Sequence, residues 1–128
     1  MVMAKTRGQI EAEISEAIIK FESEYMGRGP EEARTFILDD MVLVRLKGVL
    51  TPAENNLAAS RSEERGRMLV KQARIELLEK GRELLEAIVH DILGQEVKSL
   101  HTDISTRTGE RIIIFTLNAP PVTRNSRR

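Results

Sequence analysis

Cysteine and tryptophan are both absent from the 128-residue chain. Without cysteine, the protein has no disulfide bonds, no thiolate metal ligands and no cysteine nucleophile, a composition that a reducing cytosol permits. Aromatic residues make up only 3% of the chain, so it offers few of the exposed rings on which proteins stack single-stranded nucleic acid. We therefore expect no nucleic-acid partner.

A net charge and long hydrophobic runs are also lacking. Twenty basic and twenty acidic side chains cancel, so any electrostatic partner must be met by a local patch of charge. The first residues lack the apolar segment of a signal peptide. The longest apolar runs, such as Arg111 to Leu117, are far shorter than the roughly 20 residues that cross a bilayer. We expect a cytoplasmic protein that does not insert directly into a membrane.

Helix caps and helical periodicity indicate the helices. Thr6 to Gln9 fit a capping box, and apolar residues then recur every three or four positions, which predicts a helix from about Gln9 to Met26 with Gly27 as its left-handed cap. Thr51 to Glu54 form a second capping box, with proline at the first helical position.

The helical pattern that follows this second box continues to Leu93, and Gly94 is expected to end it. We predict a break near Ser60 to Ser62, where serines and glutamates favour a new helix start. One apolar stripe of this segment runs through Ala73, Leu77, Gly81, Leu84, Ile88 and Ile92, and Leu78, Leu85 and Val89 widen it.

Two hairpins are expected between and after these helices. Thr35 to Asp39 and Met41 to Lys47 turn at Asp39 and Asp40, and Val97 to Ser105 and Arg111 to Leu117 flank the turn Thr106 to Gly109. The αββαββ order predicts a two-layer α+β fold: a four-stranded, mainly antiparallel sheet with helices on one face, one of them long. We expect residues 1–118 to form one domain and residues 119–128 a disordered tail.

The length of the second long helix favours a dimer. A continuous helix from Ser62 to Leu93 would be roughly 48 Å long, whereas a compact chain of this size is only about 36 Å across. Either the helix is broken, with Gly66 as a candidate position, or its overhang packs on a second subunit. We expect a homodimer, in which Gly81 would permit close packing.

The stretch Gly27-Arg28-Gly29-Pro30 has the composition of a phosphate-binding loop but not its pattern. A Walker loop needs Lys and then Ser or Thr after its second glycine, whereas here a helix precedes the loop and Pro30 lacks a backbone donor. A helix cap followed by a turn explains the stretch. An anion or partner contact made by Arg28 is the alternative.

His101 and Asp103 are the candidates for acid-base chemistry. They lie two residues apart and would share one face of a strand, where a carboxylate can orient an imidazole. A polar, solvent-facing strand explains the same alternation. His90 and Asp91 lie among glutamates of a solvated helix face, so we expect no metal site, and no cofactor motif is complete.

Basic residues concentrate in the second hairpin and the tail. Arg107 and Arg111 join Arg124, Arg127 and Arg128 as the main cluster. Such a cluster could hold phosphate groups, but solvation in a flexible tail explains it equally well.

Three motifs give the chain a family resemblance: YMGRGP, VRLKGVLTPAE and HTDISTRTGE. With them the sequence from about Arg7 to Leu117 resembles the bacterial MpsC-like, or YbcI-like, family. The resemblance implies association with a Na⁺-translocating, membrane-potential-generating system, whose other components are linked to inorganic carbon uptake. It carries no catalytic residues over to this chain.

Two functional hypotheses follow. In the first, the protein is a non-enzymatic accessory or regulatory protein that docks on a membrane-bound ion-translocating or bicarbonate-linked complex, with Arg28, Arg107 and Arg111 as binding anchors and Gly27, Gly29 and Pro30 shaping the loop. In the second, it binds or transforms a small anionic ligand with His101 and Asp103 beneath the Arg28 loop. The second requires a pocket where the two loops meet.

Overall fold

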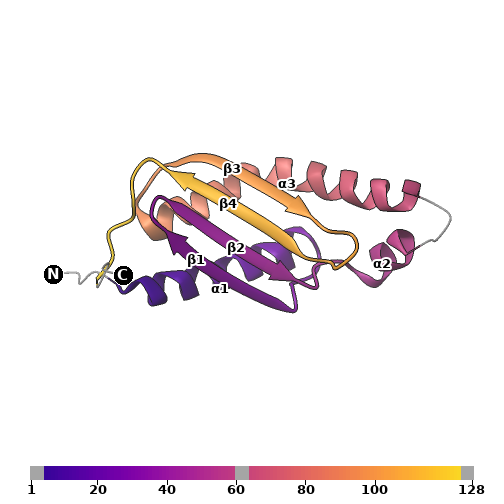
Figure 1. The fold of residues 1–128 in the computed structure, drawn as a ribbon, viewed down its shortest axis with the longest axis horizontal. Coiled ribbons are helices and arrows are strands. Elements are labelled where there is room, and N and C mark those ends of the chain that lie inside the picture. Colours follow the sequence, from indigo (N-terminus) through magenta and orange to yellow (C-terminus); the bar gives the residue numbers. More distant parts are fainter. Residues whose placement is uncertain (1–4, 60–63, 125–128) are drawn as a thin grey trace.

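A computed structural model describes residues 5–59 and 64–124 of the chain. The described residues form an α+β fold in which two long helices cover one face of a four-stranded antiparallel sheet (Figure 1). This confirms the expected fold class. The elements are, in chain order, α1 (Arg7–Tyr25), β1 (Glu32–Leu38), β2 (Met41–Lys47), α2 (Pro52–Ala58), α3 (Glu64–Leu93), β3 (Val97–Ile104) and β4 (Arg111–Leu117).

The helix caps predicted from the sequence are present. Thr6 and Gln9 form the capping box of α1, and Thr51 and Glu54 form that of α2. Gly27 follows the C-cap residue of α1, Met26, with φ of 88°, and Gly94 follows α3 with φ of 70°. Both glycines have the left-handed conformation that ends a helix without a side-chain clash.

The sheet has the strand order β1-β2-β4-β3, so the two hairpins join along their second strands. Asp39 has a φ of 59° and makes the tight turn between β1 and β2. Alternate side chains of β2 and β4 point to α1 and α3, and this inner row is fully apolar on β2, where Val42, Val44 and Leu46 are buried. The core therefore lies between the sheet and the helices.

The long helix α3 is continuous over 30 residues, about 45 Å at the usual rise. The preceding helix α2 ends at Ala58, and the predicted break near Ser60 to Ser62 lies outside the described residues. In Figure 1 the first turns of α3 extend beyond the strands, beside α2. The chain's own α2 covers the side of this overhang that carries Gly66, whereas Met68 and Leu69 are exposed.

The apolar stripe predicted for α3 is confirmed in part, because Gly81, Leu78, Leu85 and Val89 are buried. Ala73, Leu77 and Leu84 are exposed. The buried positions are Gly66, Val70, Arg74, Leu78, Gly81, Leu85 and Val89. The prediction followed the apolar residues alone, and the centre of the buried face is occupied by an arginine.

Both glycines of α3 mark close helix contacts. A Cβ at Gly81 would lie 2.8 Å from the ring of Phe21 in α1, so this glycine serves packing within the chain. A Cβ at Gly66 would lie only 2.1 Å from the carbonyl oxygen of Leu57 in α2. Gly66 therefore does not break α3 but lets α2 approach it.

The residues after β4 return to the start of α1. The backbone N–H of Arg124 donates to the carbonyl oxygen of Lys5 at 2.8 Å, so the first and last described residues of the chain lie side by side. The predicted tail, residues 119–128, is described only as far as Arg124.

We expect Gly66→Ala to destabilise the protein. The added methyl group meets rigid backbone of α2, and such overpacking costs about 1–3 kcal/mol, which outweighs the gain of about 0.5–1 kcal/mol in helix propensity. Urea unfolding measures the change. Gly8→Ala is the matched control, because a Cβ there meets nothing within 4 Å. Equal stability of the Gly66 variant and the wild type would contradict the close α2–α3 contact.

Candidate functional site

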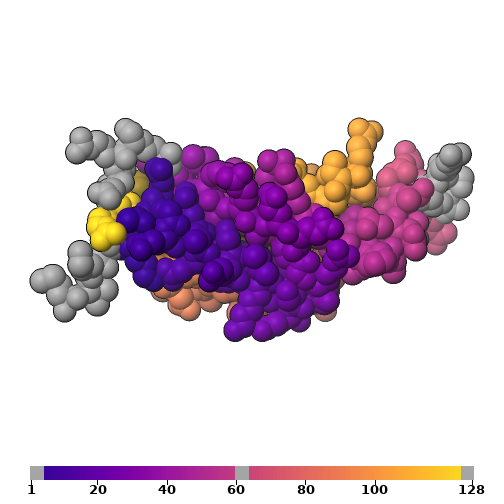
Figure 2. All heavy atoms as spheres, turned by 90° about the horizontal axis from the view of Figure 1, so that it is seen from below, coloured from indigo at the N-terminus to yellow at the C-terminus, as the bar shows by residue number. Residues whose placement is uncertain are grey.

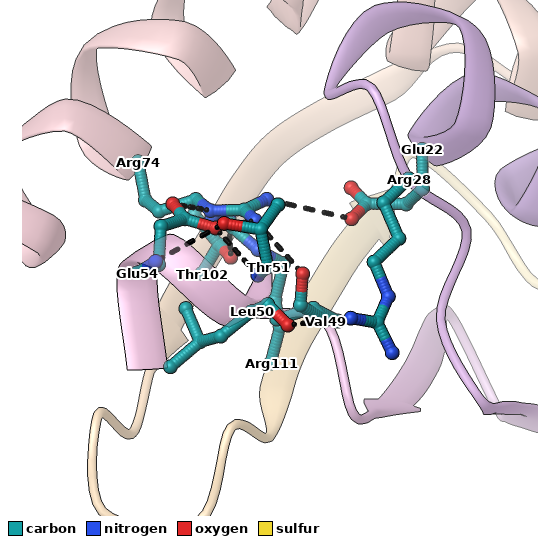
Figure 3. Close-up of polar contacts among 9 residues, drawn as sticks. All are labelled: Glu22, Arg28, Val49, Leu50, Thr51, Glu54, Arg74, Thr102 and Arg111. Carbon is teal, nitrogen blue, oxygen red and sulfur yellow. Dashed lines mark hydrogen bonds and ion pairs between the residues drawn. The ribbon is translucent and has the colours of Figure 1, made fainter. Parts of the chain in front are cut away.

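The three motifs that carry the family resemblance meet at one end of the sheet (Figure 3). The backbone N–H of Val49, after β2, donates to the carbonyl oxygen of Gly109 in the β3–β4 hairpin at 3.0 Å. Arg28, from the loop after α1, donates from Nη1 to the carbonyl oxygen of Leu50 at 3.1 Å. The segment after β2 therefore connects the other two motifs.

Arg74 of α3 joins this region from inside the core. Its Nε and Nη2 donate to the two carboxylate oxygens of Glu54 at 2.8 and 2.6 Å, and Nη2 also donates to the carbonyl oxygen of Val49 at 2.8 Å. Nη1 lies 3.9 Å from Oε1 of Glu22 in α1. With only 1% of the residue exposed, Arg74 ties α1, the segment after β2, α2 and α3 together.

Glu54 has two structural roles. Its Oε1 accepts the backbone N–H of Thr51 at 2.8 Å, which completes the capping box of α2, and the same carboxylate binds Arg74. Burial alone would raise the pKa of Glu54, but the hydrogen bonds from Arg74 and Thr51 and the charge of Arg74 together lower it. Glu54 is therefore held in its ionised form.

Glu22 and Arg111 complete a buried charge cluster of Glu22, Glu54, Arg74 and Arg111. Glu22 is fully buried, and burial raises its pKa although the charges of Arg111 and Arg74 oppose the shift. Arg111 is 2% exposed and donates to Thr102 Oγ1 at 3.2 Å; its burial lowers its pKa, which the charge of Glu22 counteracts. Neither oxygen of Glu22 has a hydrogen-bond partner among the described residues.

The buried charge cluster can bind a proton and can fix the relative positions of the elements that carry its members, but it contains no nucleophile. Two carboxylates and two guanidinium groups balance when all are ionised, so the uptake of one proton by Glu22 leaves a buried net positive charge. Because Glu22 and Arg74 belong to different helices, the protonation state of Glu22 affects the contact between α1 and α3.

The sequence interpretation missed Glu22, Glu54 and Arg74 as members of one site. A signal was available, because Glu22 and Arg74 both lie at buried positions of apolar helix stripes. Lone charged residues at such positions point to a paired partner in the core. Glu54 could be predicted only as a cap residue, since its contact with Arg74 joins residues 20 positions apart.

The Gly27–Pro30 loop is a helix cap and turn with a structural arginine. Arg28 is half-buried, and besides Leu50 it faces the carboxylate of Glu31 at 3.7 Å. A Cβ at Gly29 would lie 2.6 Å from Ser23 Oγ, so a larger residue would displace that side chain. Arg28 thus binds its own chain.

His101 and Asp103 lie on the same face of β3 but have different partners. His101 Nε2 lies 3.1 Å from Ser99 Oγ. Asp103 binds Lys71 of α3 at 3.1 Å and accepts the N–H of Ile104, and the hydrogen bonds from Lys71 and Ile104 lower its pKa. The structure thus gives no contact in which Asp103 orients the imidazole.

Of the remaining predicted binding residues, Arg107 and Arg111 are placed very differently. Arg111 belongs to the buried charge cluster, because it shares its face of β4 with Ile113 and Phe115. Arg107 is exposed at the tip of the β3–β4 hairpin. It lines a hollow of about 520 Å³ with Arg67 and Lys71 of α3, and a second of about 580 Å³ that extends to α2. We call Arg67, Lys71 and Arg107 the cationic groove.

In residues 5–59 and 64–124, no three or more His, Cys, Asp and Glu side chains are grouped to hold a metal ion. None of the helices in the same ranges has the length and apolar character that a membrane span requires.

We expect Glu22→Gln and Glu54→Gln to change the pH dependence of stability in opposite directions. The raised pKa of Glu22 contributes stability below about pH 4.3, and this contribution is lost as the pH rises through the pKa of the folded state. The wild type should therefore lose stability relative to Glu22→Gln as the pH rises to neutral. The lowered pKa of Glu54 contributes stability above about pH 4.3, which is lost in acid.

Unfolding free energies in urea, measured across this pH range for the wild type and both variants, test these signs. If the unfolding free energies of Glu22→Gln and Glu54→Gln, each taken relative to the wild type, changed in the same direction with pH, the assignment of opposite pKa shifts to the two carboxyl groups would be wrong.

Comparison with known proteins places the chain in a family. The chain is 49% identical over 115 residues to a protein of Bacillus subtilis (strain 168) described as "Uncharacterized protein YbcI", and the match covers 90% of each chain. No solved structure matches the chain. The family model described as "Na+-translocating membrane potential-generating system (MpsC)" matches residues 6–119. The protein therefore belongs to the MpsC family, as its three motifs predicted.

Proposed function

We propose that the protein is a non-enzymatic accessory or regulatory subunit that docks on a membrane-bound complex of a Na⁺-translocating, membrane-potential-generating system. In this proposal it acts from the cytoplasm, as a homodimer, and reaches the membrane only through its partner. The description of the family supports the link to the membrane system. The docking role itself is supported by one feature of the surface, the cationic groove.

Two of the three cations of the cationic groove are not used in ion pairs within the described part of the chain. Lys71 is paired with Asp103, but Arg67 and Arg107 make no ion pair with any of the described residues. Figure 2 shows the β3–β4 hairpin, in orange, projecting beside α2 and the start of α3. Exposed charges on such a rim select and steer an oppositely charged partner. We propose an acidic segment of the membrane complex as the occupant.

The anchors proposed from the sequence are revised accordingly. Arg107 remains a docking anchor, and Arg67 and Lys71 take the places of Arg28 and Arg111. Arg28 and Arg111 instead support the groove, because Arg28 holds Leu50 and Arg111 belongs to the buried charge cluster. The hairpin that carries Arg107 is fixed to Val49 through Gly109, so the shape of the groove depends on that cluster.

We expect Arg107→Glu to abolish recovery of the membrane partner. The tagged protein is isolated from gently solubilised membranes of its native host, and recovered proteins are identified by mass spectrometry. Lys80→Glu is the matched control, because Lys80 is also an exposed cation, on α3, without an ion pair in the described part of the chain. The wild type and the control should recover a specific ion-translocating membrane protein. Undiminished recovery by Arg107→Glu would exclude the groove as the docking surface.

A cavity of about 340 Å³ between α3 and β3 favours a second candidate function, the binding of a small anion. His101, Asp103 and Arg111 all line it, together with Arg82 of α3. Nε of Arg82 and Nε and Nη2 of Arg111 are buried without hydrogen-bond partners among the described residues. The other walls are apolar apart from Thr102 and Glu79, and the unpaired arginine donors would suit a small carboxylate or bicarbonate. The lining does not include the Arg28 loop that the sequence interpretation placed above it.

If this second function holds, bicarbonate or a short carboxylate should raise the melting temperature of the protein. At a hundredfold excess over the dissociation constant, binding adds about 2.7 kcal/mol to stability. The shift should disappear in Arg82→Gln and His101→Ala and persist in Lys80→Gln. A dye-monitored screen of bicarbonate, acetate, phosphate and nucleotides that gave no shift in the wild type would exclude this function.

A further inference from the structure

The face of the sheet that points away from α1 and α3 is unusually apolar. An antiparallel sheet with one solvated face normally places polar residues at its outward positions. Here six outward positions carry apolar side chains, and they lie on all strands except β3. They are Phe36, Leu38, Met41, Leu43, Ile112 and Ile114. We call them the outer apolar face; no described helix covers it (Figure 1).

The strand register arranges this face in rows across the sheet. In the central row Phe36 lies beside Leu43, Leu43 beside Ile114, and Ile114 beside His101 of β3. The half-buried Leu43 and Ile114 on the two inner strands are thus flanked by an aromatic ring at one edge of the sheet and an imidazole at the other. The middle of the face is a contiguous apolar strip.

The neighbouring row carries opposite charges at its two ends. It runs from Arg34 on β1 through Arg45 and Ile112 to Asp103 on β3. Arg45 is neutralised by Glu110 of its own chain, at 2.5 Å. Arg34 lies over the ring of Phe36, 5.5 Å from its centroid, and makes no ion pair with another described residue. Asp103 keeps 74% of its side chain exposed although it contacts Lys71.

This arrangement is complementary to itself. Consider a two-fold axis that runs parallel to the strands and lies above the outer apolar face, midway between β2 and β4. Rotation about this axis places β1 of one copy opposite β3 of the other and keeps each residue at the same position along the strand direction. Each row then lies opposite the same row of the other copy in reversed order. Arg34 of one copy therefore meets Asp103 of the other, and the two-fold symmetry produces this contact twice. Leu43 meets Ile114, and Arg45 meets Ile112. A two-fold contact requires such matching of a surface with itself.

We propose that the outer apolar face is the interface of a homodimer, in which two sheets pack face to face and two Arg34–Asp103 pairs fix the register. The inference rests on the proposed function, which includes a homodimer, and adds the surface through which the two copies contact each other. Packing of two twisted sheets in this way is the geometry of β-sandwiches. Four strands of seven or eight residues span about 19 by 24 to 27 Å, which places the contact at the small end of specific interfaces.

The test uses charge reversal and complementation, with sedimentation velocity of the purified full chain over a series of concentrations. Arg34→Asp places two carboxylates opposite each other at both ends of the interface, and Asp103→Arg places two guanidinium groups there. Each variant alone should therefore be a monomer where the wild type is a dimer. In an equimolar mixture every pair is again opposite in charge, so the two variants should form a heterodimer.

Controls separate this proposal from unfolding and from the docking function. Circular dichroism should show both variants folded, and Lys80→Glu, outside the face, should dimerise like the wild type. A monomeric wild type, or variants that dimerise alone as well as the wild type does, would overturn the proposed interface. Neither result would bear on the cationic groove, whose own test is recovery of a membrane partner.

Discussion

The three bonds that Arg74 makes at the start of α2 are the interaction on which the rest of the structure depends. Its guanidinium holds Glu54 with two hydrogen bonds and the carbonyl oxygen of Val49 with a third. Val49 in turn binds the β3–β4 hairpin through Gly109, and the adjacent Leu50 binds Arg28. The cap of a short helix, a loop and a hairpin are thus positioned by one buried arginine, and with them the walls of the cationic groove.

Burying this cluster costs free energy that apolar packing would not. Removing one partner of a buried ion pair typically destabilises a protein by about 3–5 kcal/mol, yet replacing a whole pair by apolar residues is often neutral. A buried charge cluster is therefore better explained by the single arrangement that it specifies than by net stability. Glu22 is fully buried and has a raised pKa, so it is the carboxylate of the cluster that is protonated most easily.

Much of the fold could be predicted from sequence because its signals are local. Thr6 and Thr51 carry capping boxes, Gly27 and Gly94 end helices, and the strands alternate visibly. Arg111 was misplaced because its charge was considered before its register: it alternates with Ile113 and Phe115, which are core residues. The buried face of α3 was predicted only in part for a related reason, since Arg74 is a charged residue within a buried stripe.

The candidate site could not be predicted in the same way, because its contacts join distant parts of the chain. Glu22, Glu54, Arg74 and Arg111 come from α1, α2, α3 and β4, and no local rule brings them together. The same limit applies to the outer apolar face. Its residues are visible in the sequence as apolar strand positions, but the row from Arg34 to Asp103 exists only once the register of all strands is known.

Hydrogen exchange of Arg74→Lys, followed by mass spectrometry, tests the central claim most directly. Lysine keeps the positive charge but lacks the planar fork that binds Glu54 and Val49 at once. If Arg74 positions the three motifs together, then segments 26–31, 48–54 and 105–111 should all lose protection, while the β1–β2 turn at 38–41 should not change. Loss of protection confined to segment 48–54 would contradict the account, because the loop and the hairpin would then be held independently of Arg74.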